Sequence, residues 1–264
     1  VTVRARRRGR SAPEARAALR ARLAAEGQPA RPAALGPRAL HLVGPRPDIR
    51  GSPAFRDGDF EVQDEGSQLV LEAVGARPGE VVVDLCAGSG GKTLGLADDL
   101  DGRGRLIACD LEPARLADLR GRLKARGAEA EVELLDGTEA PARLGPKLGR
   151  NGVDRVLVDA PCSGLGVLRR GPDRRWRVDP GHLSSLAELQ RRLLLAGAAL
   201  LRPGGRLVYA TCTLGTIENH PVADAGDASS MLRPVDVLPE RRRVELRPDV
   251  EGTDGFFLAA WRRR

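Results

Sequence analysis

The sequence has 264 residues, of which 41% are hydrophobic, and a formal net charge of +7. This length allows one large domain with a small appendage, and the hydrophobic fraction is enough for a sizeable core. No apolar run is long enough to span a membrane, and no signal peptide is expected. The four cysteines form neither a CxxC pair nor a disulfide framework, so we expect no metal site and a cytoplasmic monomer.

The positive charge is concentrated near the N-terminus. Residues 1–55 hold twelve arginines against three acidic residues, whereas acids and bases nearly balance in the rest of the chain. A GC-rich genome can enrich arginine everywhere, but it does not explain this asymmetry. Basic blocks of this kind typically bind polyanions, so we expect nucleic acid, and RNA in particular, as the partner.

The first 54 residues have the pattern of a small basic α/β module. Leu19 and Leu23 lie at helical spacing, and turn-forming residues separate this module from the remainder. In chain order the pattern predicts a strand at 1–8, a helix at 13–25, short apolar stretches at 33–35 and 39–43, and a Pro- and Gly-rich linker at 44–53.

Residues 55–264 form the second predicted domain, in which apolar strands alternate with helices. This alternation is typical of an α/β fold with a parallel, doubly wound sheet. The predicted helices are 65–75, 93–100, 113–126 and 183–201, and the predicted strands are 81–85, 105–109, 132–135, 153–158, 206–210 and 256–261.

A glycine-rich loop follows the first strand of this domain. Residues 82–93 read Val-Val-Asp-Leu-Cys-Ala-Gly-Ser-Gly-Gly-Lys-Thr, and such glycines let the backbone approach a nucleotide or nucleoside closely. One interpretation is a Walker A phosphate loop, because Gly91-Lys92-Thr93 fits its end, but Cys86 stands where that motif needs glycine. The other interpretation is the first loop of an S-adenosylmethionine methyltransferase.

Acidic residues end the next two predicted strands. S-adenosylmethionine has no phosphates, so its ribose hydroxyls and adenine amine need carboxylate partners, and Asp110 and Asp136 meet that need. Either residue alone could instead cap a helix. The candidate cofactor-binding residues are therefore Cys86, Ala87, Gly88, Ser89, Gly90, Gly91, Lys92, Asp110 and Asp136.

Two cysteines follow predicted buried strands. Residues 155–162 end in Asp-Ala-Pro-Cys, and residues 206–212 end in Ala-Thr-Cys. Ligands of open α/β sheets bind outside the carboxyl ends of the strands, so Cys162 and Cys212 suggest sulfur chemistry there. A lone cysteine is more simply a small buried hydrophobe, but two at equivalent strand ends favour a function.

A basic loop comes soon after the first of these cysteines. Residues 168–177 contain five arginines and Trp176, which suits phosphate contact and base stacking. The alternative is a solvated loop in which Trp176 is buried as a packing anchor.

Together these motifs resemble the Nop/Sun family of RNA cytosine-5 methyltransferases, and within it the bacterial Sun (Fmu) ribosomal RNA enzymes. The likeness runs through the second domain in the family's order. It rests on Val62-Gln-Asp-Glu-Gly-Ser-Gln-Leu69, Asp84-Leu-Cys-Ala87, Gly90-Gly-Lys-Thr93, Asp110, Asp136-Gly137, Asp159-Ala-Pro-Cys-Ser-Gly164, Tyr209-Ala-Thr-Cys212, Glu218-Asn219 and Asp254-Gly-Phe-Phe257.

The resemblance implies a Rossmann-like methyltransferase sheet, S-adenosylmethionine as cofactor, and RNA, ribosomal RNA first, as substrate. It implies that Cys212 is the nucleophile that adds to carbon 6 of cytosine and that Cys162 helps to release the product. Asp159 could hydrogen-bond the base edge or touch the cofactor, and Lys92 could favour a nearby thiolate. The first 54 residues look like the family's RNA-binding module.

Three other functions remain open at this point: a transfer RNA enzyme of the same family, a P-loop-like nucleotide-binding protein, and an inactive RNA-binding factor. Two strand-end thiols argue against the last. The chain also departs from the family's pattern. Gly88-Ser89 replaces an Ala/Ser-Pro pair, and residues 223–230 replace an apolar helix and predict a mobile region. The family's helical domain ahead of the module is missing, so we expect a short form or a fragment.

Overall fold

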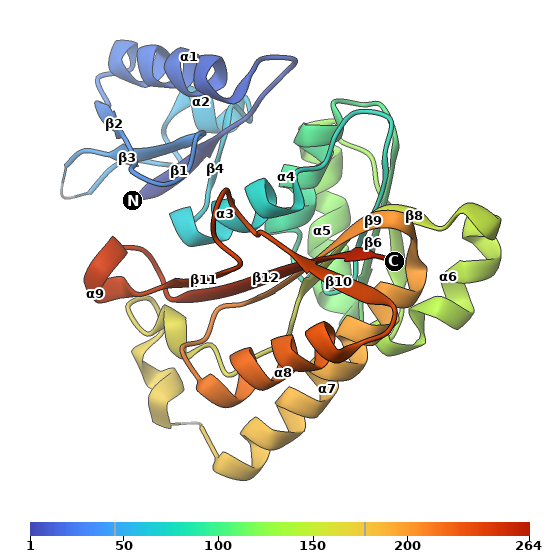
Figure 1. Cartoon of the computed structure of the whole chain (residues 1–264). Helices are drawn as coiled ribbons and strands as arrows, with labels where there is room; N and C mark the ends of the chain where they lie inside the picture. Colours follow the sequence, from blue (N-terminus) through green and yellow to red (C-terminus); the bar gives the residue numbers. More distant parts are fainter. Residues whose placement is uncertain (45, 177) are drawn as a thin grey trace.

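Two β-sheets organise the chain, a small antiparallel one near the N-terminus and a large mixed one in the remainder (Figure 1). The computed structural model describes residues 1–44, 46–176 and 178–264, so Pro45 of the predicted linker and Arg177 of the predicted basic loop lie outside the described residues. Within the described ranges, none of the helices has the length and apolar character needed to cross a membrane.

The small sheet has the strand order β2-β3-β1-β4 and packs against helix α1. Helix α1 begins after Ser11, which forms a capping box with Glu14. Its buried Leu19 and Leu23 share one apolar cluster with Phe60, so the helix is held by its apolar face. The bounds are β1 (Thr2–Ala5), α1 (Ala12–Ala25), β2 (Ala30–Pro32), β3 (Ala39–Leu42), α2 (Pro53–Arg56) and β4 (Phe60–Val62).

This sheet extends past residue 54, where the sequence pattern ended the module. Strand β4 pairs with β1, with Val62 opposite Val3 and Phe60 opposite Ala5. Just before β4 in the chain, helix α2 begins at Pro53 and is capped by Ser52, so the predicted linker ends in a helical turn. Strand β2 lies at residues 30–32, just before the apolar stretch expected at 33–35, and ends at Pro32, which has no N–H to extend the ladder.

The large sheet has the order β10-β12-β9-β8-β5-β6-β7, with β11 beside β12. From β9 to β7 all neighbouring strands are parallel, which confirms the Rossmann-like, doubly wound core. The prediction of a wholly parallel sheet is wrong at one edge, where β12 is antiparallel to β9, β10 and β11. Only the short helix α9 separates β11 from β12, whereas a parallel neighbour needs a long crossover.

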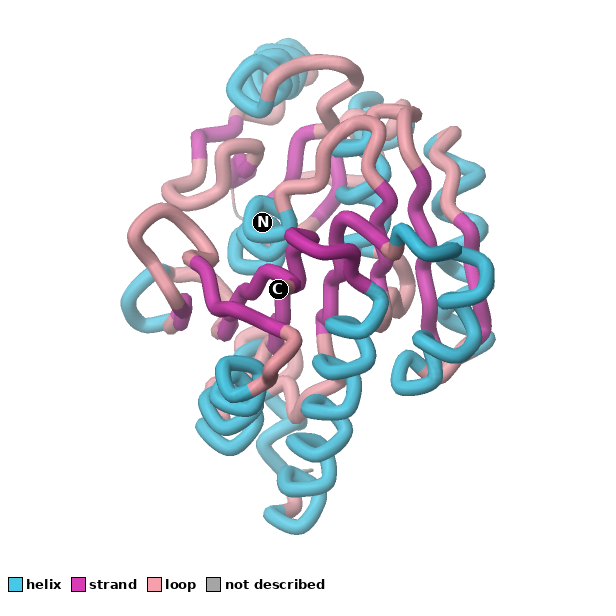
Figure 2. The backbone as a smooth tube through the Cα atoms, turned by 45° about the vertical axis from the view of Figure 1, so that its right-hand side comes forward, coloured by secondary structure: helices cyan, strands magenta, loops and turns pink. Residues whose placement is uncertain are grey.

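Helices cover both faces of the large sheet (Figure 2). Helices α3, α4 and α5 pack against one face through two apolar clusters, and α6, α7 and α8 pack against the other through one. The strands are β5 (Val81–Asp84), β6 (Arg105–Asp110), β7 (Glu131–Leu134), β8 (Val153–Asp159), β9 (Leu201–Thr211), β10 (Leu232–Val235), β11 (Arg243–Leu246) and β12 (Phe256–Arg263). The helices are α3 (Glu65–Val74), α4 (Gly91–Leu100), α5 (Pro113–Arg126), α6 (Ala140–Leu148), α7 (Pro180–Leu200), α8 (Thr216–Ala228) and α9 (Pro248–Glu251).

The region predicted to be mobile, residues 223–230, belongs mostly to helix α8, so that prediction is wrong. Val222 and Ala223 are fully buried. A Cβ added at Gly226 would lie 2.7 Å from the Trp261 ring, so the small residues make room for a large aromatic side chain. Strand β9 also begins earlier than predicted, at Leu201, directly after α7.

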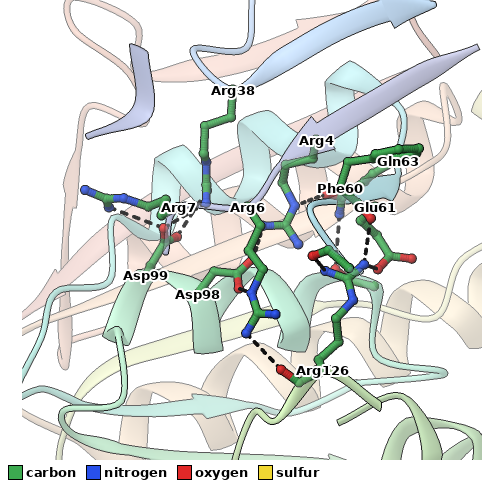
Figure 3. A network of polar contacts seen from close by, with 12 residues as sticks. Arg4, Arg6, Arg7, Arg38, Phe60, Glu61, Gln63, Asp98, Asp99 and Arg126 are labelled. Carbon is green, nitrogen blue, oxygen red and sulfur yellow. Dashed lines mark hydrogen bonds and ion pairs between the residues drawn. The ribbon is translucent and has the colours of Figure 1, made fainter. Parts of the chain in front are cut away.

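Arginines of the small sheet join it to helix α4 (Figure 3). Arg4 Nη1 lies 2.9 Å from Asp98 Oδ2, and Arg6 Nε lies 3.0 Å from Asp98 Oδ1. Arg38 Nη1 lies 3.0 Å from Asp99 Oδ1. The side chains of Arg4 and Arg38 are only 1% and 2% exposed. Buried ion pairs therefore fix the module to the large domain, and we call these five residues the junction cluster.

Candidate active site

A cavity of about 640 Å³ opens at the carboxyl ends of the parallel strands β5, β6, β7, β8 and β9. This is the edge at which ligands of open α/β sheets bind. Among the residues proposed from the sequence, those that line the cavity are Cys86, Ala87, Gly88, Ser89, Asp110, Asp136, Asp159, Cys162 and Cys212. Gly90, Gly91 and Lys92 do not line it.

The two glycines at the end of the loop have other tasks. Gly90 adopts φ +89°, and a Cβ there would lie 2.3 Å from the Leu119 side chain, so only glycine lets α4 pack beside α5. The Gly91 carbonyl accepts a hydrogen bond from Gln63 at 3.3 Å, which ties α4 to the segment after β4. Both residues shape the loop without facing the cavity.

Asp110 holds the loop that faces the cavity. Its Oδ2 accepts the backbone N–H of Gly88 at 2.8 Å, and its Oδ1 accepts the N–H of Glu112 at 2.9 Å. A carboxylate oxygen has a second lone pair, so each oxygen can accept a further bond from a ligand hydroxyl. A Cβ added at Gly88 would meet no protein atom within 4 Å, which leaves open space beside the loop.

Asp136 caps a turn and also presents a second oxygen to the cavity, the two roles that its position at a strand end suggested. Its Oδ1 accepts both the N–H and the hydroxyl of Thr138 at 2.8 Å, so the residue does cap a short turn. Its Oδ2 accepts no hydrogen bond from any described residue and is available to a ligand donor. The carboxylates, together with the apolar Leu111 and Leu135, give the cavity the acceptors and apolar surface that a nucleoside requires.

The sequence analysis missed several residues of this cavity. Glu112 and Leu111 directly follow the strand-end Asp110, and this adjacency was the one signal available for them. Leu186, Leu189 and Leu193 come from helix α7, far along the chain, at positions that no motif marks. The lining residues missed altogether are Leu111, Glu112, Arg115, Leu135, Leu186, Leu189 and Leu193; Leu85, Gly137, Ala160 and Pro161 lie inside the quoted motifs but were not proposed as site residues.

The two cysteines at the strand ends face each other. Strands β8 and β9 are parallel neighbours, with Asp159 opposite Ala210, and the Sγ atoms of Cys162 and Cys212 lie 3.5 Å apart. A hydrogen bond from the Cys162 thiol lowers the pKa of Cys212 and raises that of Cys162 well above its ordinary value. Burial and Asp159 oppose the shift at Cys212, whereas Lys92 favours it.

Lys92 and Asp159 form a charge pair beside these thiols. Lys92, from the first turn of α4, places its Nζ 2.6 Å from Asp159 Oδ2 and 5.6 Å from the centre of the Phe256 ring. Burial lowers the pKa of Lys92, but the Asp159 carboxylate outweighs burial and raises it, so the amine stays charged. The pair therefore puts an ammonium and a carboxylate near the sulfurs, and the carboxylate has the larger effect of the two on the pKa of Cys212.

A buried acid lies behind the glycine loop. Asp84 is fully buried and accepts a hydrogen bond from the Thr93 hydroxyl at 2.8 Å. Burial raises the pKa of Asp84 to about 7. A Walker A loop would turn this hydroxyl toward Mg²⁺, so its burial against a carboxylate argues against the phosphate-loop interpretation. Among the described residues, no group of three or more His, Cys, Asp or Glu side chains could hold a metal ion.

The basic loop after Cys162 lies beside the same edge. Arg174 lines a smaller cavity of about 320 Å³ together with Cys162 and His182. Trp176 is 78% exposed and stacks under the Arg175 guanidinium, 4.7 Å from the ring centre. The alternative that Trp176 is a buried packing anchor is therefore wrong.

Comparison with known proteins now places the chain in a family. Residues 71–262 match the family model described as 16S rRNA methyltransferase RsmB/F. The chain belongs to this family. The predicted Nop/Sun relationship is thereby confirmed. The prediction that S-adenosylmethionine is the cofactor is confirmed with it, because this is the family's cofactor. The acceptors and apolar residues of the cavity fit that molecule.

Individual relatives agree. The chain is 44% identical over 243 residues to the protein named "Putative methyltransferase Rv1407" of Mycobacterium tuberculosis, covering 86% of this chain and 50% of that protein. It is 33% identical over 262 residues to the probable ribosomal RNA small subunit methyltransferase B of Bacillus subtilis, covering 94% and 57%. The chain thus spans about half the length of these relatives. A solved methyltransferase homologue from Pyrococcus horikoshii is 28% identical, with a TM-score of 0.83 over all of this chain and 86% of that one.

Proposed function

We propose that the chain is the methyltransferase part of an enzyme that methylates carbon 5 of a cytosine in RNA, most directly small-subunit ribosomal RNA. The observation that carries this proposal is the pair of thiols 3.5 Å apart at the edge of the nucleoside-sized cavity. A methyltransferase that acts on oxygen or nitrogen needs no such pair. The name of the Bacillus subtilis relative supports ribosomal RNA as the substrate, and hence action in the cytoplasm.

The cavity residues divide the task of holding the cofactor. Asp110 would accept the ribose hydroxyls and Asp136 the adenine amine, while Leu111 and Leu135 would flank the adenine ring. Gly88 and Ser89 would lie along the rest of the cofactor, so the Gly-Ser pair takes the place of the family's Ala/Ser-Pro. When bound, S-adenosylmethionine supplies a methyl group on a sulfonium centre, ready for attack by carbon.

Cys212 would begin the reaction. Carbon 5 of cytosine is too weak a nucleophile to take a methyl group unaided, so the Cys212 thiolate first adds to carbon 6. Addition leaves the electron pair of the carbon 5–carbon 6 double bond on carbon 5. Carbon 5 would take the methyl group with this pair, while the bond from the methyl group to the sulfonium sulfur breaks and its electrons stay on sulfur. Lys92, held by Asp159, would offset the negative charge that addition places on the ring, and Asp159 would lie near the base edge.

Release needs the reverse electron flow. Carbon 5 now carries both its original hydrogen and the new methyl group. A base removes that proton, the electron pair of the carbon–hydrogen bond restores the double bond, and the Cys212 thiolate leaves carbon 6. Cys162 would assist this step, since its sulfur lies 3.5 Å from that of Cys212.

Contacts with RNA would come from two basic surfaces. Arg174 and Trp176 lie on the loop beside the cysteines and suit phosphate contact and stacking of an extruded base. On the N-terminal module, six arginines already form ion pairs with acids of this chain, namely Arg4, Arg6, Arg7, Arg8, Arg22 and Arg38. Its RNA-binding role would therefore fall to the other six.

The two cysteine variants test the mechanism. Cys212→Ala should abolish methyl transfer and form no adduct, whereas Cys162→Ala should add to the base but release it poorly. Cys162→Ala should therefore accumulate a protein–RNA adduct that survives denaturing electrophoresis. Cys109→Ala, which removes a buried thiol from strand β6, is the matched control and should methylate normally.

Other outcomes have clear meanings. An adduct with Cys212→Ala but not with Cys162→Ala would reverse the two roles. Intact methylation in both variants, without adduct, would refute the covalent mechanism. Bisulfite sequencing of ribosomal and transfer RNA after incubation with the active chain would identify the substrate, and modified transfer RNA alone would replace ribosomal RNA in the proposal.

A further inference from the structure

Two consecutive residues near the start of helix α8, Glu218 and Asn219, reach the loops that carry the cysteines. Both are almost completely out of solvent, with 0% and 4% of their surface exposed. The family motif contains this pair, but neither residue lines the cofactor cavity. Their side chains instead point to the segments on either side of the two thiols.

Asn219 holds both neighbours of Cys212. Its Oδ1 accepts a hydrogen bond from the Thr211 hydroxyl at 2.7 Å, and its Nδ2 donates to the Thr213 carbonyl at 3.1 Å. One buried amide therefore fixes the residue before the thiol and the residue after it. The chain around Cys212 is clamped just where strand β9 ends.

Glu218 does the same for Cys162. Its carboxylate accepts the backbone N–H of Ser163 at 2.8 Å and the Ser163 hydroxyl at 2.5 Å. It also accepts from Gln190 Nε2 at 3.1 Å, and this amide group donates at 2.8 Å to the carbonyl of Pro161, the residue before the thiol.

The two clamps are joined and seated on the sheet. The hydroxyls of Ser163 and Thr213 lie 2.8 Å apart, which connects the two cysteine loops directly. The buried Tyr209 of strand β9 donates its hydroxyl to the Glu218 carbonyl at 2.7 Å. The first turn of α8 is thus fixed to the strand that delivers Cys212, and buried, satisfied networks of this kind restrict geometry.

We propose that Glu218 and Asn219 are positioning residues that hold the two cysteine sulfurs close to each other, so that both thiols can act on the same base. The assignment of nucleophile and release thiol rests on the proposed function, whereas the positioning of the sulfurs does not. Neither residue touches the sulfurs, so each acts through the loop that it holds. Without the clamps, the two loops would be ordered independently and the sulfurs would no longer be held side by side.

A merely structural role predicts a different result from a positioning role. Both would lower stability on substitution, but only positioning sets the reactivity of Cys212 toward a small electrophile. The groups that face this sulfur are Cys162, Asp159, Lys92 and Arg174. Of these neighbours, only Cys162 depends directly on the clamped loops, so loss of the clamp should move the pKa of Cys212 upward.

Alkylation of the RNA-free protein by iodoacetamide tests this without any substrate. Peptide mass spectrometry would follow modification of Cys212 from pH 5 to pH 10 in Asn219→Ala, Glu218→Ala and Glu218→Gln. The two alanine variants should move the midpoint of alkylation to higher pH, and a midpoint that is higher by one pH unit should slow alkylation at neutral pH about tenfold. Glu218→Gln retains an acceptor and should recover most of the wild-type rate.

Controls separate the outcomes. Asp224→Ala removes an exposed ion pair of the same helix, with Arg243, and should leave the midpoint unchanged. Ser163→Ala removes the hydroxyl contacts to Thr213 and Glu218 without a substitution in α8, and serves if the other variants fail to fold. A wild-type midpoint in Asn219→Ala and Ser163→Ala, even with reduced melting temperatures, would overturn the proposal. Because no RNA is used, failure of the methylation assay would leave this result intact.

Discussion

The junction cluster differs in its charges from the sheet edge that carries Cys162, Cys212, Lys92 and Asp159, here called the cysteine edge, although polar side chains are buried at both. At the junction, Arg4 and Arg6 share Asp98, and Arg38 meets Asp99, so each buried charge has an opposite charge within 3.0 Å. At the cysteine edge, two sulfurs face each other and one charged pair lies beside them. Opposite charges that meet in the interior hold an architecture together, whereas a thiol whose pKa is shifted by its neighbours keeps the capacity to react.

This contrast changes how the N-terminal charge is understood. In sequence the twelve arginines of residues 1–55 form one basic block. In the fold, half of them neutralise acids of the same chain. The remaining arginines, which form no ion pair with a described residue, are Arg10, Arg16, Arg20, Arg31, Arg46 and Arg50. Net charge alone therefore overstates the surface that could meet RNA.

Removing a carboxylate from the junction cluster should have the largest effect on stability. Asp98→Ala leaves Arg4 and Arg6 without their partner, and breaking a buried ion pair typically costs about 3–5 kcal/mol. Urea unfolding should report this loss. The exposed pair Lys147–Glu133, 2.7 Å apart, gives the control: Lys147→Met should cost about 0–1 kcal/mol. Equal costs at the two sites would abolish the distinction between junction and surface pairs.

The pH dependence of stability should show the effect of Asp84, a buried carboxyl group that has no ion-pair partner among the described residues. Its pKa is raised by burial to about 7 from an ordinary value of 3.8, so well below pH 4 the carboxyl is neutral in both the folded and the unfolded chain. As the pH rises toward 7, the Asp84 carboxyl ionises in the unfolded chain but stays protonated in the folded chain. The free energy of unfolding of the wild type therefore falls relative to that of Asp84→Asn. The unfolding free energies of the two proteins should separate by an amount on the order of 4 kcal/mol between pH 4 and 7, and then stay parallel. A gap that does not depend on pH would contradict the raised pKa.

The parallel core and its strand-end residues could be predicted because each depends on local patterns. Short β-branched runs indicated β5, β6 and β8, and the acids or cysteines that end those runs meet at one edge because parallel strands share an orientation. Family resemblance supplied the roles of Cys162 and Cys212, which spacing alone left open.

What escaped prediction depends on partners far apart in the chain. The antiparallel position of β12 follows from pairing on both of its sides, and the order of α8 follows from Gly226 beneath Trp261. Likewise, nothing near Arg4 in the sequence indicates a partner 94 positions away at Asp98. Charge patterns show composition, but only the fold shows which charges cancel.

The cofactor cavity should respond less strongly than the junction. Asp110→Ala removes the proposed acceptor of the ribose hydroxyls and two loop hydrogen bonds, and should weaken S-adenosylmethionine binding by about 1–3 kcal/mol in calorimetry. Asp118→Ala, at an exposed position of α5, is the control and should bind normally. Unchanged affinity in Asp110→Ala would remove this residue from the site, and tight binding of ATP with Mg²⁺ instead would overturn the cofactor assignment.

The smallest expected effect concerns the unpaired arginines of the module. Replacing the exposed Arg10 and Arg20 by glutamine removes at most two phosphate interactions. Removal of each one should weaken RNA binding modestly and reduce the slope of log affinity against log salt by about 1, because fewer counterions are released. Fluorescence anisotropy at several salt concentrations would measure both quantities.

Arg241 and Arg242, also exposed but outside the module, give a matched pair with the same change in net charge. A smaller slope for the module pair alone would assign the RNA contact to the arginines that the junction leaves unpaired. Equal changes for both pairs would mean that RNA responds only to total charge, and the module would then serve the fold more than the substrate.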